Sequence, residues 1–260
     1  MKATAFAYAK PASLAEALEL LERPGAKVLA GGQSLIPSLN MRLSSPELLV
    51  DITGLQGLRG VSLKNATLSV GALTTHAEIE KSSEIKAHVP LLAEAAPHIA
   101  HPAIRNRGTI GGSLALADPA AEYPACAVAL NATLVLESRK GKRKILADRF
   151  FKGLFETDLK PVEILVAVEF PAAKKDDKSV FLELARRHGD YATVGLAAHN
   201  ERVVFFGVAS VPVFVSLHEA KAFVKEKLQP DPDLYHSRET KRHLAGVLLE
   251  RAWTTLSTSR

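Results

Sequence analysis

Two pairs of adjacent glycines, each followed closely by a serine, most restrict how this 260-residue chain can fold. The first pair lies in the run Ala30-Gly31-Gly32-Gln33-Ser34-Leu35, and the second in Thr109-Ile110-Gly111-Gly112-Ser113-Leu114. Paired glycines permit positive φ and close backbone approach, and consecutive N–H groups can then converge on an anion. Two such loops could hold the two phosphates of a dinucleotide from both sides. The alternative is that they are two ordinary tight turns.

The rest of the sequence narrows the chemistry mainly by what it lacks. It has neither Gly-x-Gly-x-x-Gly nor Gly-x-x-x-x-Gly-Lys-Ser/Thr, which argues against a Rossmann NAD site and a P-loop ATPase. The single cysteine, Cys126, cannot supply the thiolates of an iron–sulfur cluster or a cysteine-built zinc site. The nine histidines show no metal-ligand spacing. With no paired carboxylates or nucleophile constellation either, we expect no catalytic residue and no metal site in this chain.

Charge and hydropathy argue against nucleic-acid binding and membrane insertion. The net charge is only +5, and the basic residues from Arg139 to Lys144 lie at an expected turn, where they would be solvated. The longest uncharged apolar stretch, residues 203–217, contains Pro212 and is shorter than the ~20 residues of a membrane helix. A single cysteine suits a reducing compartment. We therefore expect a cytoplasmic protein.

The order of expected strands and helices predicts an α+β fold in parts, because the elements do not alternate as strict βαβ units. Ser13 followed by Glu16 predicts a helix start, and two period-two runs joined at residues 64–66 predict a hairpin. Further strands are expected near residues 27–30, 48–52, 132–137, 164–170 and 203–209. Further helices are expected from Thr75 and Val89 and over residues 123–130, about 216–228 and 237–256.

A polar segment, residues 171–178, is the expected domain boundary. It separates a first domain of residues 1–173 from a small α+β domain of residues 179–260. The first domain is expected to have two subdomains, about residues 1–55 and 56–173. With these bounds, each glycine pair lies in a different subdomain.

Two long runs around the glycine pairs resemble a known family. Residues 29–42 (LAGGQSLIPSLNMR) and 104–125 (IRNRGTIGGSLALADPAAEYPA) are similar to the flavin-binding motifs of the FAD-containing medium subunit of molybdenum hydroxylases. The resemblance is strongest to the medium chains of aerobic carbon monoxide dehydrogenase-like enzymes. The family also contains the xanthine dehydrogenase FAD subunits. Shorter likenesses at residues 163–171 and 185–195 extend the resemblance over about residues 1–215.

The resemblance implies FAD as the cofactor, and for the first domain the two-lobed FAD-binding fold of vanillyl-alcohol oxidase-like flavoproteins. Two sets of residues would hold the pyrophosphate from opposite sides: Ala30, Gly31, Gly32, Gln33, Ser34 and Leu35, and then Thr109, Gly111, Gly112 and Ser113. Asp118 and Glu122 would supply acidic contacts to the FAD. Leu165 would pack beside the isoalloxazine and Tyr191 would stand over it. For Tyr191, a half-buried core position is the alternative.

The same resemblance implies an electron-transfer subunit of a molybdenum hydroxylase complex. It would take electrons one at a time from the [2Fe-2S] clusters of a small subunit, fed by a molybdopterin-binding large subunit, and pass them to an external acceptor. A dimer of heterotrimers is the implied assembly. Two alternatives stay open, a stand-alone FAD-dependent oxidase or dehydrogenase of the vanillyl-alcohol oxidase-like class and a FAD-holding assembly module. The residues after position 178 are few for the substrate-capping domain of such an oxidase.

Overall fold

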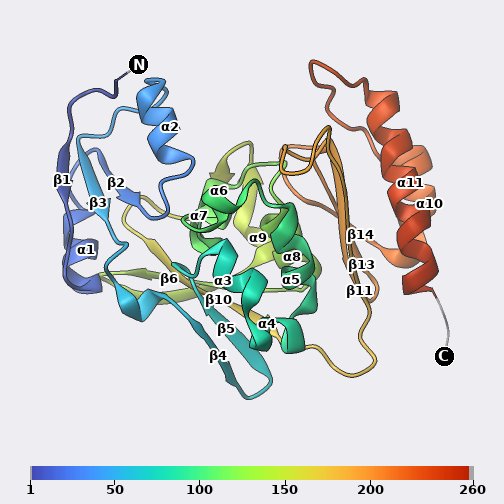
Figure 1. Cartoon of the computed structure of the whole chain (residues 1–260), viewed down its shortest axis with the longest axis horizontal. Coiled ribbons are helices and arrows are strands. Elements are labelled where there is room, and N and C mark those ends of the chain that lie inside the picture. The colour runs from blue at the N-terminus through green and yellow to red at the C-terminus, as the bar shows by residue number, and fades with distance from the viewer. Residues whose placement is uncertain (1, 258–260) are drawn as a thin grey trace.

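Three main sheets follow one another along the chain, and helices lie between the second and the third (Figure 1). The computed structural model describes residues 2–257. In Figure 1 the first sheet is blue at the left, the central sheet lies below the middle, and the third stands at the right beside the C-terminal helices. This mixture of helices and sheets confirms the predicted α+β class.

The first sheet is parallel and has the strand order β1-β3-β2. Its unit consists of β1 (Ala7–Ala9), α1 (Leu14–Leu20), β2 (Ala26–Leu29), α2 (Leu35–Asn40) and β3 (Leu48–Asp51). The Ser13 hydroxyl accepts a hydrogen bond from the Glu16 N–H at 3.2 Å, so the predicted helix start is confirmed. The first glycine loop leaves β2 and enters α2 directly.

The central sheet is antiparallel and has the order β4-β5-β10-β6-β7. Its strands are β4 (Val61–Lys64), β5 (Thr67–Gly71), β6 (Thr133–Ser138), β7 (Gly141–Leu146) and β10 (Ile164–Pro171), and a small ribbon pairs β8 (Phe151–Gly153) with β9 (Glu156–Thr157). At the predicted hairpin, Asn65 and Ala66 both have positive φ, 48° and 57°, which suits the twist of a two-residue turn. The last strand in sequence, β10, therefore lies in the middle of the sheet.

Short helices cover one face of the central sheet. They are α3 (His76–Lys81), α4 (Ser83–His88), α5 (Pro90–Ala95), η2 (Ala96–His98), α6 (Pro102–Arg105), α7 (Ile110–Leu116), α8 (Glu122–Ala129) and α9 (Ala147–Phe150). The 3₁₀ turn η1 (Gln56–Leu58) instead packs through Leu58 in the hydrophobic cluster of the first unit. Thr75 begins α3 with a complete capping box, because its hydroxyl accepts from Glu78 and the Glu78 carboxylate accepts from Thr75. The second glycine loop becomes the first turn of α7.

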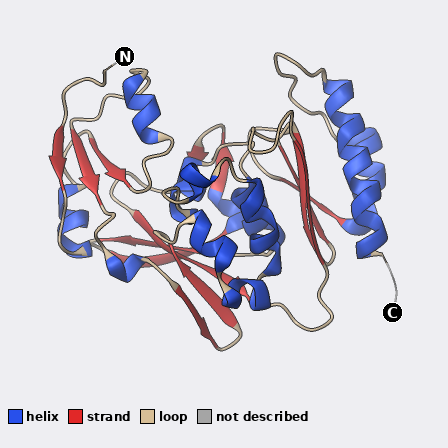
Figure 2. Ribbon diagram, in the orientation of Figure 1, coloured by secondary structure: helices blue, strands red, loops and turns tan. Residues whose placement is uncertain are grey.

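The third sheet is an antiparallel meander with the order β11-β12-β13-β14. Its unit contains β11 (Ser179–Leu184), β12 (Val194–His199), β13 (Arg202–Phe206), β14 (Val213–Ser216), α10 (Leu217–Ala222), a π-helical turn η3 (Phe223–Lys227) and α11 (Arg238–Leu256). One face of this sheet packs on α11, and the other packs on α5 and α8. Figure 2 shows those two helices of the central unit between the central and third sheets.

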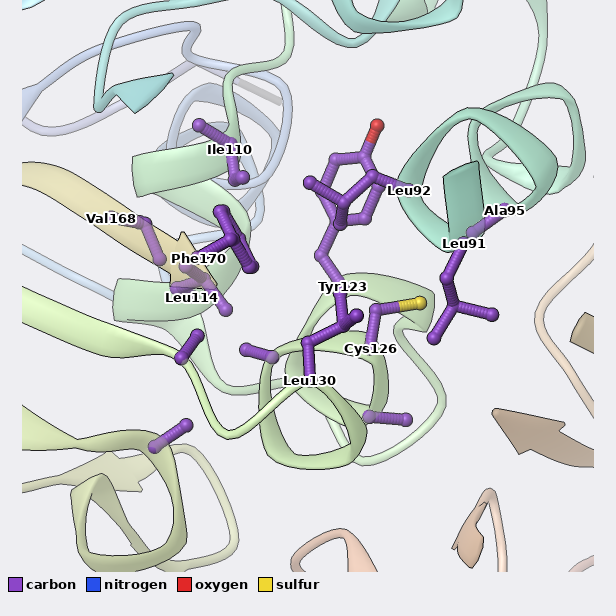
Figure 3. Packing of buried hydrophobic residues seen from close by; sticks show 14 of the residues in the cluster. Leu91, Leu92, Ala95, Ile110, Leu114, Tyr123, Cys126, Leu130, Val168 and Phe170 are labelled. Carbon is purple, nitrogen blue, oxygen red and sulfur yellow. The ribbon is translucent and has the colours of Figure 1, made fainter. Parts of the chain in front are cut away.

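The largest hydrophobic core lies where the central unit meets the third sheet. Figure 3 shows Tyr123 and Cys126 of α8 gathered with Leu91 and Leu92 of α5 and with Leu114 of α7. All five of these side chains are fully buried. Side chains of β11, β12 and β13 belong to the same cluster, so this core joins the central unit to the C-terminal one.

The structure differs from the sequence-based expectation at several elements. Helix α7 occupies the segment that the sequence presents as the second glycine loop, α2 follows the first, and β1, β11, β12 and β14 were not among the strands expected at named positions. Pro37 is accommodated because it lies in the first turn of α2, where an N–H has no helical acceptor. The helix expected over about 216–228 is divided into α10 and the π-helical turn η3.

The basic residues around the β6–β7 turn form ion pairs. Arg143 bonds Asp158 at 2.7 Å and Glu163 at 2.6 Å, and Lys144 bonds Glu169 at 2.7 Å. Acidic neighbours therefore balance much of this cluster's charge. Among residues 2–257, no helix is both long enough and apolar enough to cross a membrane.

Candidate functional site

The first glycine loop presents a row of backbone donors. The N–H groups of Gly31, Gly32, Gln33 and Ser34 donate to no acceptor within the described chain. Gly32 has a φ of +74°, which a residue with a side chain adopts only at a cost. The Gln33 side chain donates back to the Gly31 carbonyl at 3.0 Å. This loop has the open donors that an anionic ligand requires.

The second glycine loop is already hydrogen-bonded to its own unit. Ile110 N–H donates to the Thr74 carbonyl at 3.1 Å, and Gly111 N–H donates to the Ala72 carbonyl at 2.9 Å. Gly112 N–H donates to the hydroxyl of Thr109, the residue that caps α7. Neither glycine has positive φ. The expected nest of converging N–H groups is therefore absent from these residues of the second loop, although the sequences of the two loops are similar.

Close packing explains the second pair of glycines. A Cβ at Gly111 would lie 2.5 Å from the Ala72 Cβ and 2.7 Å from the Ala72 carbonyl oxygen, distances that a real side chain does not adopt. A Cβ at Gly112 would meet only the Thr109 hydroxyl, at 3.0 Å. Gly111 is thus required by the contact between α7 and the segment that follows β5.

A neutral histidine, His76, packs against the backbone that leads into the second loop. His76 is 5% exposed, and burial, followed by the nearby charge of Arg105, lowers its pKa to about 4. Its backbone N–H donates to the Gly108 carbonyl at 3.0 Å. A Cβ at Gly108 would come within 2.7 Å of the imidazole ring. The uncharged ring therefore packs directly under the backbone that leads into Thr109.

The first glycine loop lies against the segment that leads into the second. A Cβ at Gly31 would lie 2.2 Å from the Arg107 carbonyl oxygen, so only glycine permits this approach of the two backbones. A cavity of about 230 Å³ opens at the contact. Its lining comes from both motifs and from two further segments: Ala30, Gly31, Thr53, Arg59, Leu73, Thr75, Asn106, Arg107 and Thr109.

The charged groups of this cavity favour an anion. Arg59 pairs with Glu78 at 2.8 Å, which offsets its charge. Arg107 is exposed and forms no ion pair with the described residues. Gly31, whose N–H is open, and Arg107 therefore line one cavity.

Three further residues implied by the resemblance gather where the central unit meets the third sheet. Asp118 accepts from the Ala120 N–H at 2.9 Å, and burial raises its pKa. Glu122 is 7% exposed, and burial, followed by the charges of Glu183 and Asp118, raises its pKa to about 8. Tyr191 is 73% exposed, and partial desolvation of its hydroxyl, then the carboxyls of Asp118 and Glu122, raise its pKa. The core position considered for Tyr191 is therefore wrong.

Leu165 lies apart from these groups in a core position. It is 5% exposed, lies on β10 opposite Leu136 and belongs to the largest hydrophobic cluster. The ladder between β10 and β6 shifts register between Leu165 and Ala167. Only a small edge of the Leu165 side chain could meet a ligand.

Sequence reasoning missed several residues of the site. Asn106 and Arg107 precede the second glycine pair directly, so their position beside the motif was the available signal. Thr53 and Arg59 come from other segments, and nothing local in the sequence links them to the glycine loops. Glu183, which raises the pKa of Glu122, is likewise brought close only by the fold.

Comparison with known proteins identifies the family. Residues 4–173 match the family described as the FAD binding domain in molybdopterin dehydrogenase. The chain is 46% identical over 200 residues to the 6-hydroxypseudooxynicotine dehydrogenase complex subunit alpha of Paenarthrobacter nicotinovorans, covering 76% of this chain and 68% of the relative. It is 36% identical over 273 residues to the carbon monoxide dehydrogenase medium chain of Hydrogenophaga pseudoflava, covering 95% of each.

A solved structure supports the same assignment. The carbon monoxide dehydrogenase of Hydrogenophaga pseudoflava, solved without the Mo-pyranopterin moiety of its cofactor, contains a chain that superimposes with a TM-score of 0.93. The identity is 33%, and the match covers 99% of both chains. The chain belongs to the FAD-binding domain family of molybdopterin dehydrogenases, so FAD is its cofactor. The family, fold and cofactor predicted from the sequence are thereby confirmed.

Proposed function

We propose that the first glycine loop is the main pyrophosphate site, with Ala30 to Leu35 on one wall and Arg107 and Thr109 on the other. The observation that carries this proposal is the row of open N–H donors from Gly31 to Ser34. Backbone donors fixed in a loop bind phosphate oxygens without a loss of side-chain entropy. Thr109, Gly111, Gly112 and Ser113 then act by holding the opposite wall in place, and the Ser113 hydroxyl adds a contact.

The isoalloxazine would lie at the junction of the central unit and the loop that precedes β12. Asp118, Glu122 and Tyr191 are close enough there for each carboxyl to affect the tyrosine pKa. Tyr191 has the exposure that a ring covering one face of the flavin needs. Leu165 would support this region from the core. When bound, the FAD supplies the capacity to accept and release electrons singly or in pairs.

The flavin is held without a covalent bond in this proposal. Cys126 is fully buried, and burial, followed by the charge of Glu122, raises the pKa of its thiol well above the usual value. A buried, protonated thiol is a poor nucleophile. His101 lies beside Gly189 on the surface and is the other residue that a covalent link could use.

The proposed role is electron transfer within a molybdenum hydroxylase complex. Electrons would come from the [2Fe-2S] clusters of a small subunit and ultimately from a molybdopterin-binding large subunit, and would leave to an external acceptor. Both reported relatives are named as a subunit or chain of a dehydrogenase. A dimer of heterotrimers in the cytoplasm completes the proposal. Against a stand-alone oxidase, the third sheet packs on helices at both faces and so does not form a cap over a substrate.

A reduction experiment separates these roles. The full-length chain, purified with its FAD, is mixed anaerobically with a reduced [2Fe-2S] subunit or with alcohol and phenol substrates typical of stand-alone oxidases. We expect the iron–sulfur protein to bleach the flavin absorbance and the small molecules to leave it unchanged. Bleaching by a small substrate alone would favour the oxidase. Release of FAD into the supernatant after acid denaturation tests the absence of a covalent link.

A further inference from the structure

Arg59 is one of two arginines that line the cavity beside the glycine loops, and Arg107 is the other. They come from different segments, since Arg59 follows η1 and Arg107 precedes α7. None of the described residues that line this cavity is acidic. Glu78, the ion-pair partner of Arg59, is not among them. Only the positive member of this ion pair therefore borders the space that a ligand would fill.

The ion pair uses a single N–H group of the Arg59 guanidinium. The Nε–H donates to both carboxylate oxygens of Glu78, at 2.8 and 3.0 Å. The two terminal nitrogens carry four further N–H groups, and none of these donates to a described residue. The side chain is 43% exposed, so a ligand can reach it. Arg59 therefore keeps the pair of nitrogens with which arginine binds phosphate oxygens.

Glu78 is itself held in place, so it fixes the Arg59 side chain. Its Oε2 accepts from the Thr75 N–H and from the Thr75 hydroxyl, each at 2.8 Å. Thr75 also lines the cavity, and its backbone pairs with that of Thr109 in an isolated antiparallel bridge. A guanidinium fixed before binding loses less side-chain entropy when it binds an anion.

The backbone on both sides of Arg59 is fixed as well. The Thr74 hydroxyl accepts from the Gly60 N–H at 2.9 Å and donates to the Gly60 carbonyl at 3.1 Å. Thr74 is buried. The Leu73 N–H donates to the Leu58 carbonyl at 2.8 Å. Arg59 therefore stands on a segment that is tied to the residues leading into α3.

We propose that Arg59 binds one phosphate of the FAD diphosphate and so favours a diphosphate over a monophosphate ligand, an inference that rests on the proposed function. Its terminal nitrogens donate to the phosphate oxygens while its Nε–H stays on Glu78. Arg107, on a separate segment, serves the other phosphate. Two cations from separate segments suit a ligand with two phosphates, because each phosphate carries a negative charge.

Titration of the ligand-free, full-length chain with FAD tests this assignment. Arg59→Gln should weaken FAD binding by about tenfold or more, because it removes charge-assisted hydrogen bonds to phosphate. Glu78→Gln should change the affinity by about threefold or less, because glutamine also completes a capping box and its amide oxygen can still accept from Arg59. Arg149→Gln removes an exposed arginine on α9 that does not line the cavity, and it should keep the wild-type affinity.

The preference for a diphosphate is measured by calorimetric titration with ADP and AMP, which share adenosine and differ by one phosphate. The wild-type chain should bind ADP about tenfold more tightly than AMP, and Arg59→Gln should remove most of that difference. Equal affinities for ADP and AMP in the wild-type chain, or binding of neither, would overturn the preference. An unchanged ratio in Arg59→Gln would overturn the role of Arg59 in it.

A further variant separates phosphate binding from a structural role. Arg59→Lys keeps the charge but lacks the planar fork, and it should lose about fivefold in FAD affinity. Equal losses in Arg59→Gln and Glu78→Gln would mean that only the ion pair matters, which would overturn the proposal. FAD affinities in both Arg59 variants equal to that of Arg149→Gln would also overturn it. A wild-type chain that binds no FAD would instead overturn the proposed function.

Discussion

The two glycine loops have similar sequences but differ in backbone conformation and hydrogen bonding. In the first, Gly32 adopts positive φ and four consecutive N–H groups remain open. In the second, both glycines have ordinary φ, and the N–H groups from Ile110 to Gly112 already have acceptors inside the protein. Glycine therefore provides backbone freedom at one loop and close packing at the other. In our proposal, the first loop binds the phosphates and the second holds in place the wall that the first one faces.

The largest effect should come from filling the packed glycine. Gly111→Val should lower the free energy of unfolding by about 3 kcal/mol or more, because its Cβ would meet Ala72 at 2.5 Å in a buried contact. Chemical denaturation of the ligand-free chain measures this. Gly57→Val is the control, since a Cβ at Gly57 meets no atom within 4 Å. An unfolding free energy for Gly111→Val equal to that of the control would contradict the packing role.

A side chain in the first loop should weaken FAD binding more than it lowers the stability of the fold. Gly32→Val places a β-branched residue at a φ of +74° and redirects the open N–H groups, so we expect about 100-fold weaker FAD binding. Equilibrium titration of the ligand-free chain with FAD gives the affinity. Gly141→Val imposes similar strain at a φ of +118° in a distant hairpin, with no atom within 4 Å of its Cβ. The two loops would not differ as described if Gly32→Val kept its affinity.

Acid should loosen the second loop through His76. Its pKa in the folded protein is about 4, below the unfolded value of 6.5, so its contribution to stability is complete above pH 6.5 and is lost as the pH falls through 4. We expect the unfolding free energy to drop by about 2 kcal/mol between pH 7 and 4 from this residue. His76→Asn should reduce that dependence. The exposed His218→Asn should leave it unchanged, and equal slopes in the two variants would contradict the assignment.

The elements predictable from the sequence are those whose signals are local. Ser13 with Glu16 marks a helix start, and residues 64–66 mark a hairpin, because the atoms that make these structures are close in sequence. The family and its cofactor were also predictable, since the two motif runs are long. Neither inference required knowledge of contacts between distant segments.

What could not be predicted depends on contacts between distant segments. The residues around Gly111 do not reveal its contact with Ala72, which lies 39 residues earlier in the sequence. That contact is what requires a glycine at position 111. Similarly, the residues around Glu122 do not reveal Glu183, which lies 61 residues later and whose charge helps to raise the Glu122 pKa. The exposure of Tyr191 follows from the path of its loop. The sequence around this residue would suit a tyrosine in the core equally well.

The central position of β10 has a consequence for the growing chain on the ribosome. Hairpin β4–β5 is complete by Gly71, yet the strand that joins it to β6 ends at Pro171, 100 residues later. At ordinary synthesis rates, β5 waits about 5 to 20 s for its partner with one edge uncovered. An exposed strand edge invites pairing with other chains. Nascent chains stalled before residue 164 should therefore engage holding chaperones, and release should follow once β10 has left the exit tunnel.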